Sequence, residues 1–161
     1  MTTNTRVRDW DPSSGDALQG DVIMFEIPHD IKIVRTDEIL PRDGRLVLAE
    51  GEITGHHHAI WMRNPATSFH DAALARSLEN AASAPAGQQA RLYRDPAAVD
   101  ELVKRGFLTT NRLAIGFLVV ENAPETVTHD EHDGIRIIRP AVVYVGGQQE
   151  WDAGEARRVA D

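Results

Sequence analysis

The sequence predicts a mainly β fold, a small β-sandwich or barrel with a two-helix insertion. Apolar runs of strand length recur along the chain and are separated by Gly, Pro and Asp, which favour turns. Helical patterns are confined to one segment, residues 64–111. The length of 161 residues suits one domain, and 42% hydrophobic with 26% charged residues is typical of globular proteins. We therefore expect a single β-rich unit.

The expected strands begin after a turn signal at Gly20-Asp21. Residues 22–27 are almost continuously apolar and end at Pro28, which favours a buried strand. Further strands are expected at residues 31–34, 45–49, 52–62, 113–120, 126–128, 135–138 and 141–145. Strands thus outnumber helices on both sides of the insertion.

Two helices are expected within the insertion. Asp71 is a suitable N-cap for a helix that ends near Ala82. The second helix has clearer limits, because Asp95 is a good N-cap and Pro96 suits the first helical position. Gly106 stands where a left-handed C-terminal cap belongs.

The two ends of the chain are polar. Residues 1–19 are expected to form a flexible N-terminal arm, in which Trp10 docks on the chain's own domain rather than on a partner. Residues 20–155 are expected to form the domain, and the charged residues 156–161 a short tail.

Composition excludes several classes of function. A net charge of −8 disfavours general nucleic-acid binding, which requires positive charge against phosphate. The chain has no cysteine, which excludes disulfides, thiolate zinc sites and a cysteine nucleophile. No apolar run of about 18 residues is present, so we expect no membrane association. The N-terminal residues lack the apolar stretch of a secretory signal, and we expect a cytoplasmic protein.

Two pairs of histidines carry the strongest chemical signal. Side chains alternate between faces along an extended strand, so His56 and His58 should point to one side and His57 to the other. His129 and His132 lie three residues apart in an expected turn, which can bring both rings to one side. The two pairs together can supply nitrogen ligands to a divalent metal ion, zinc being best suited.

Acidic residues accompany both pairs. Glu52 and Glu131 are candidates for a general base, an oxygen ligand or a partner that orients an imidazole. Two other interpretations of the histidines stay open. The histidines can form a solvated surface, or they can form a hydrogen-bonded structural or pH-sensing cluster.

An HxH on a strand followed much later by a second histidine pair is similar to the layout of the cupins, small barrels that hold a metal ion with histidines. The chain more closely resembles a group of small uncharacterised bacterial proteins that share its GxxTGHxH segment, residues 51–58, and its THxxH segment, residues 128–132. This resemblance covers the β portion and not residues 64–111. It implies that His56, His58, His129 and His132 belong together.

Two functional hypotheses follow. In the first, the protein is a metal-binding β-protein with His56, His58, His129 and His132 as ligands, and a metalloenzyme acting on a small molecule is one form of this hypothesis. In the second, it is a non-catalytic assembly module whose histidine cluster is structural. We expect a homo-oligomer in either case, with the N-terminal arm or the helical insertion available to a protein partner.

Overall fold

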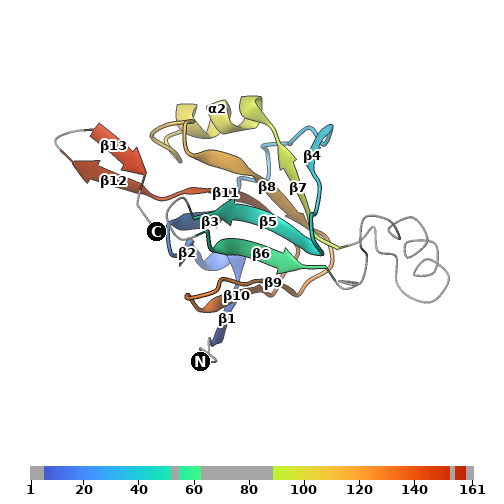
Figure 1. Ribbon diagram of the computed structural model, residues 1–161. Helices are drawn as coiled ribbons and strands as arrows, with labels where there is room; N and C mark the ends of the chain where they lie inside the picture. The colour runs from blue at the N-terminus through green and yellow to red at the C-terminus, as the bar shows by residue number, and fades with distance from the viewer. Residues whose placement is uncertain (1–5, 52–54, 63–88, 153–154, 159–161) are drawn as a thin grey trace.

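The computed structural model describes residues 6–51, 55–62, 89–152 and 155–158. The helix expected at residues 71–82 and the candidate base Glu52 lie outside these ranges. The described chain is mainly β, with four open sheets and one α-helix (Figure 1). No helix in the described part is long and apolar enough to cross a membrane.

The largest sheet has six strands, and every neighbouring pair in it is antiparallel. The strands, in spatial order, are β2 (Ala17–Gln19), β3 (Val22–Glu26), β11 (Ala141–Gly147), β8 (Ala114–Val120), β7 (Arg91–Arg94) and β4 (Asp37–Ile39). The two longest strands, β8 and β11, are central neighbours. They come from the two most strongly apolar runs after the insertion.

A second layer lies against this sheet (Figure 1). It consists of a hairpin, β5 (Arg45–Glu50) and β6 (His57–Trp61), and a three-stranded sheet ordered β1 (Val7–Trp10), β10 (Gly134–Ile137) and β9 (Glu125–Val127). An isolated bridge between Ala59 and Thr128 connects the hairpin to the end of β9. The two groups of strands are therefore joined into one layer by backbone pairing.

The main hydrophobic core fills the space between the two layers. Side chains alternate along β11, so Val143 and Val145 face this core while Tyr144 faces the other side. The second layer contributes Ile60 from β6 and Ile137 from β10. All four of these aliphatic side chains are at most 1% exposed, which makes the layered arrangement the main source of hydrophobic stabilisation.

One helix covers the opposite face of the six-stranded sheet. This helix, α2 (Pro96–Lys104), begins where the sequence predicts, with the Asp95 carboxylate accepting from the backbone N–H of Ala98. Gly106 follows its last turn with φ +83°, the left-handed conformation expected of a C-terminal glycine. Leu102 is fully buried in a second core that includes Tyr144.

The architecture resolves one of the expected alternatives. None of the sheets closes on itself among the described strands, so the fold is sandwich-like and the expected barrel is not formed. The closed layout of the cupins is accordingly not confirmed.

The described part of the expected N-terminal arm contains regular secondary structure. Residues 7–10 form β1, η1 (Pro12–Ser14) follows, and residues 17–19 form β2 at the edge of the main sheet. Trp10 is 7% exposed, and its indole N–H donates to the Gly15 carbonyl at 2.9 Å. Backbone pairing with β10 and burial of Trp10 order a segment whose polar composition alone suggests mobility.

The C-terminal end also differs from the expected tail. β12 (Gln149–Asp152) and β13 (Glu155–Arg158) pair as an antiparallel hairpin that extends from the body of the molecule (Figure 1). Residues 156–158 therefore belong to a strand, while residues 159–161 lie outside the described ranges.

Candidate functional site

The two histidine pairs come together through backbone pairing. Ala59 in β6 and Thr128 after β9 exchange two backbone hydrogen bonds, at 3.0 and 2.8 Å, and the Thr128 hydroxyl donates to the Ala59 carbonyl at 3.1 Å. In an antiparallel bridge the flanking residues are also neighbours, which places His58 beside His129. Segments about 70 positions apart in sequence thus meet at one point.

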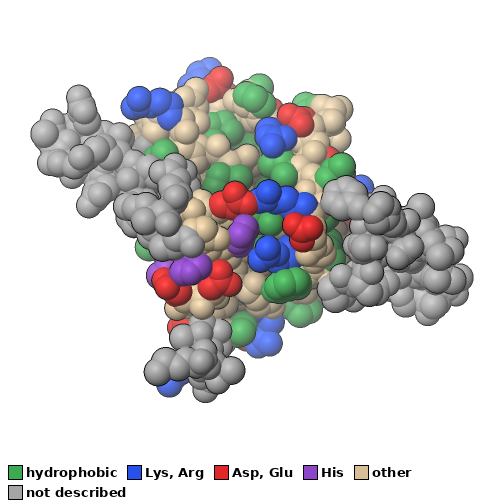
Figure 2. All heavy atoms as spheres, viewed as in Figure 1, with side chains coloured by type: hydrophobic (Ala, Val, Ile, Leu, Met, Phe, Trp, Pro, Cys, Tyr) green, Lys and Arg blue, Asp and Glu red, His purple; other side chains and the backbone are tan. Residues whose placement is uncertain are grey.

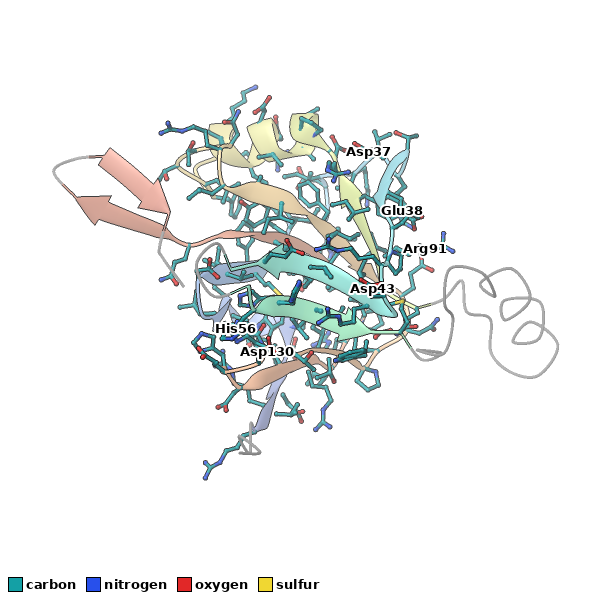
Figure 3. The ribbon with its side chains drawn as sticks, in the orientation of Figure 1. Asp37, Glu38, Asp43, His56, Arg91 and Asp130 are labelled. Atoms are coloured by element: carbon teal, nitrogen blue, oxygen red, sulfur yellow. The ribbon has the colours of Figure 1, made fainter. Side chains whose placement is uncertain are left out.

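His129 lies at the centre of the resulting cluster. Its ring centroid is 4.3 Å from that of His58, 4.5 Å from that of His132 and 5.7 Å from that of His56. His56 and Asp130 are labelled at this end of the second layer in Figure 3, and histidine and acidic side chains adjoin on the surface there in Figure 2. We call His56, His58, His129 and His132 the histidine cluster.

His57 points away from the cluster, as the strand periodicity predicts. Its Nε2 lies 3.1 Å from Oε1 of Glu50, which also forms an ion pair with Arg42. The faces of the strand therefore separate the three adjacent histidines into one outward ring and two rings that approach His129.

His58 is the deepest member of the cluster, with a side chain that is 0% exposed. Its Nδ1 lies 2.9 Å from Oε1 of Gln19, and its Nε2 lies 3.1 Å from Oδ1 of Asp21. Gln19 and Asp21 are themselves 2% and 3% exposed. Both ring nitrogens of His58 thus have buried partners supplied by the turn between β2 and β3.

The Gln19 amide defines the tautomer of His58. Its NH₂ group donates to the backbone carbonyls of Val127, at 3.1 Å, and Asp133, at 2.8 Å. The amide oxygen must then face His58, so Nδ1 of that ring carries a proton and donates it. Nε2 of the same ring faces Oδ1 of Asp21 at 3.1 Å.

The ring of His129 organises the loop that follows it. Its Nδ1 accepts from the backbone N–H of Glu131, at 3.0 Å, and of His132, at 3.1 Å. A nitrogen that accepts two donors carries no proton, so in this arrangement the ring proton of neutral His129 is on Nε2. The side chain closes a tight turn and presents Glu131 and His132 at the edge of the cluster.

The edge of the cluster is partly open to solvent. The side chain of His56 is 27% exposed and that of Glu131 is 60% exposed, and their Nδ1 and Oε2 atoms are 3.6 Å apart. His132 is half-buried, and Asp130 is exposed. Exposure therefore increases across the cluster, from the buried His58 to the accessible, acidic edge at Glu131.

The structure places the predicted ligands near one another, but their side chains are not all directed at one common position. Among the described residues, no group of three or more His, Asp or Glu side chains has the geometry to hold a metal ion as the side chains stand. The ligand roles of the four histidines and the catalytic role of Glu131 stay predictions.

Sequence reasoning missed Gln19 and Asp21 as members of the site. They flank Gly20, which has φ +56°; the sequence pattern assigns Gln19 to the N-terminal arm and Asp21 to a turn. Both side chains are buried although both residue types are polar, and a polar residue on each side of a tight glycine turn is the available signal. Only the pairing of distant strands shows that these side chains meet His58.

Residues 18–96 match a domain of unknown function, DUF8820. The matched segment contains Gln19, Asp21 and the histidine run, and it ends before His129. It is not a complete structural unit in this fold, because β3 pairs with β11 and β7 pairs with β8, both beyond the match. No curated protein and no solved structure matches the chain.

Proposed function

We propose that the histidine cluster binds a divalent metal ion, with zinc best suited to imidazole ligands. The observation that supports the proposal is the spacing of His56 and His132 around His129, at 5.7 and 4.5 Å between ring centroids. His56 immediately precedes β6, His129 and His132 lie in the loop after β9, and His56 and His132 reach solvent. We therefore propose His56, His129 and His132 as the ligands.

Simple geometry supports a shared ion. With zinc about 2.0–2.1 Å from a ring nitrogen, each ring centroid lies about 3.2 Å from the ion, and two tetrahedral ligands have centroids about 5 Å apart. The observed separations of 4.5 and 5.7 Å bracket this value. Rotation of the rings about their side-chain bonds, with a small movement of the loop, is what binding would require.

His58 has a different place in this proposal from the one that the sequence suggests. Both of its nitrogens are directed to buried protein groups, and turning either one to an ion would leave Gln19 or Asp21 without that partner. We propose that His58 supports the site by packing against His129, at 4.3 Å between centroids. Glu131, at the edge of the cluster, is the described candidate for a base acting on a metal-bound water.

The direct test is the metal content of the full-length chain prepared without a histidine tag. We expect about one zinc ion per chain, and a loss of affinity of at least about tenfold in His56→Ala and in His132→Ala. His29→Ala is the matched control, because His29 is 88% exposed and belongs to a separate ion pair with Glu26. Equal zinc affinity in all three variants, or no binding by the unaltered chain, would contradict the proposal.

A second function is favoured by one specific observation. Both nitrogens of His58 and Nδ1 of His129 already bind protein groups, which is the arrangement of a structural hydrogen-bonded cluster. We propose as the alternative that the cluster holds β2, β6 and the loop after β9 together in a non-catalytic, self-associating module. Absence of zinc binding together with a strong loss of stability in His58→Ala would favour this alternative.

A further inference from the structure

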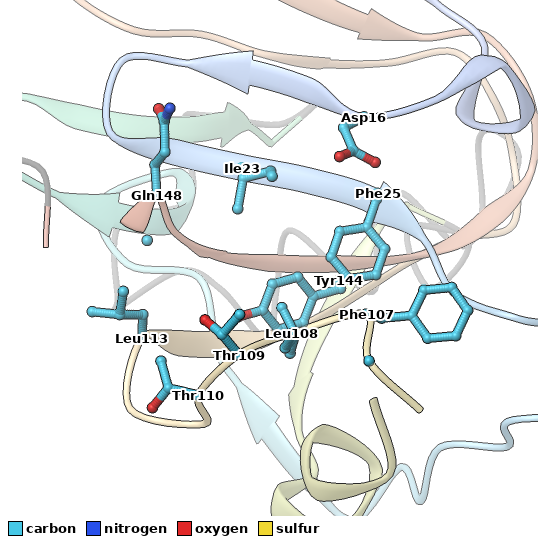
Figure 4. A pocket seen from close by; sticks show the side chains of 12 residues that line it. Asp16, Ile23, Phe25, Phe107, Leu108, Thr109, Thr110, Leu113, Tyr144 and Gln148 are labelled. Atoms are coloured by element: carbon cyan, nitrogen blue, oxygen red, sulfur yellow. The ribbon is translucent and has the colours of Figure 1, made fainter. Parts of the chain in front are cut away.

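A pocket of about 460 Å³ lies on the helix side of the six-stranded sheet (Figure 4). Its walls are the strands β3 and β11 and the loop that follows α2. This volume falls within the range of natural small-molecule sites. Tyr144 lines the pocket, whereas its neighbours Val143 and Val145 face the core on the opposite side of the sheet. The pocket is therefore separated from the histidine cluster by the sheet itself.

Aromatic rings form one wall of the pocket. The ring centroid of Phe25 is 4.9 Å from that of Tyr144 and 6.5 Å from that of Phe107, and the Phe25 and Phe107 planes are within 22° of parallel. The side chain of Phe107 is 51% exposed, so this ring is accessible from solvent. Phe107 thus offers a ring face to a ligand, while Phe25 and Tyr144, 7% and 1% exposed, form the buried part of the wall.

The polar groups of the pocket carry charge of one sign only. Among its described lining residues, Asp16 is the single charged side chain, and none is Lys, Arg or His. Thr109, Thr110 and Gln148 add uncharged hydrogen-bonding groups (Figure 4). A carboxylate beside aromatic faces attracts a cation and repels an anion.

We propose that this pocket binds a small organic cation, an amine with a flat apolar body, with its ammonium group at Asp16 and its apolar body against Phe25 and Phe107. The two halves of such a molecule match the two kinds of surface in the pocket: the ammonium forms a charge-assisted hydrogen bond and the ring packs on π faces. The phenol of Tyr144 is neutral at physiological pH and adds no second negative charge. The proposal is independent of metal binding.

Three related probes separate the contributions of charge and ring. Tryptamine carries an indole and an ammonium, 3-ethylindole carries the ring alone, and indole-3-propionate carries a carboxylate. In amide ¹H–¹⁵N NMR titrations of the full chain, we expect tryptamine to shift resonances of the loop at residues 106–110 and of Gln148. We expect it to bind at least about tenfold more tightly than indole-3-propionate, which is about 1.4 kcal/mol.

Matched variants test whether Asp16 is the source of the preference for a cation. Asp16→Asn should bring tryptamine to within about twofold of 3-ethylindole. Asp43→Asn is the control, because Asp43 is another exposed aspartate that does not line the pocket, and it should leave all three affinities unchanged. Thr109→Trp should fill the pocket and abolish the localised shifts while the rest of the spectrum reports an intact fold.

Two results would overturn the proposal. The first is indole-3-propionate binding as tightly as tryptamine. The second is the absence of localised shifts with millimolar tryptamine in the folded protein.

Discussion

The imidazole of His58 and the carboxyl group of Asp21 form a hydrogen-bonded pair that is almost completely shielded from water, with 3.1 Å between Nε2 and Oδ1. The two residues are 37 positions apart, on β6 and on the turn before β3. Their pairing holds the edge of the main sheet against the second layer. The ring of His58 in turn packs against His129 at the centre of the histidine cluster, at 4.3 Å between centroids.

Removing one partner of the pair should strongly destabilise the fold. We expect His58→Ala to lower the free energy of unfolding by about 3–5 kcal/mol, because it removes the hydrogen bond between the ring and the buried Asp21 carboxyl and opens a cavity. Urea denaturation measures the change. His29→Ala breaks an ion pair whose histidine is 88% exposed and should change stability by less than about 1 kcal/mol. Similar losses in the two variants would show that burial of the His58 pair is energetically unimportant.

Zinc binding should change the amide NMR resonances of the loop after β9. An ion at Nε2 of a neutral imidazole leaves the proton on Nδ1, and Nδ1 of His129 accepts from the amides of Glu131 and His132. Addition of zinc should therefore move these two amide resonances more than others, and magnesium, which prefers oxygen ligands, should not. A hundredfold excess over Kd should stabilise the fold by about 2.7 kcal/mol. Uniform small shifts would argue against His129 as a ligand.

A methyl group at Gly146 should disturb the ring that lies over it. A Cβ at this position would lie 2.6 Å from Cζ and 2.8 Å from Cε1 of Tyr144. We expect Gly146→Ala to lower the free energy of unfolding by about 1–3 kcal/mol, through overpacking. In the background Tyr144→Val, the same substitution should be less destabilising, because the ring is gone. Equal effects in the two backgrounds would rule out this contact as the cause.

The stability of the fold should fall at high pH because of Tyr144. Burial raises the pKa of this phenol from 10.0 to about 12. The folded state therefore holds the proton more tightly than the unfolded state. The resulting stabilisation is fully present below about pH 10, and it is lost as pH rises through about 12; a difference of two pKa units corresponds to about 3 kcal/mol. Denaturation at pH 9 and pH 12 should show this loss in the unaltered protein and not in Tyr144→Phe.

The local features of this fold are readable from its sequence. Asp95, Pro96 and Gly106 delimit α2 because capping depends only on neighbouring backbone groups. The outward direction of His57 follows from the alternation of side chains along a strand. The apolar runs that become β8 and β11 are evident because a strand that is buried on both faces of a sheet requires continuous hydrophobicity.

Tertiary structure alone decided what these elements meet. The segment with Trp10 is polar in composition, yet it is ordered by pairing with β10, more than 120 positions away. Gln19 and Asp21 become partners of His58 only because β2 and β6 approach each other through the packing of two layers. Residue patterns encode local backbone preferences, whereas contacts between distant segments depend on how all the layers pack at once.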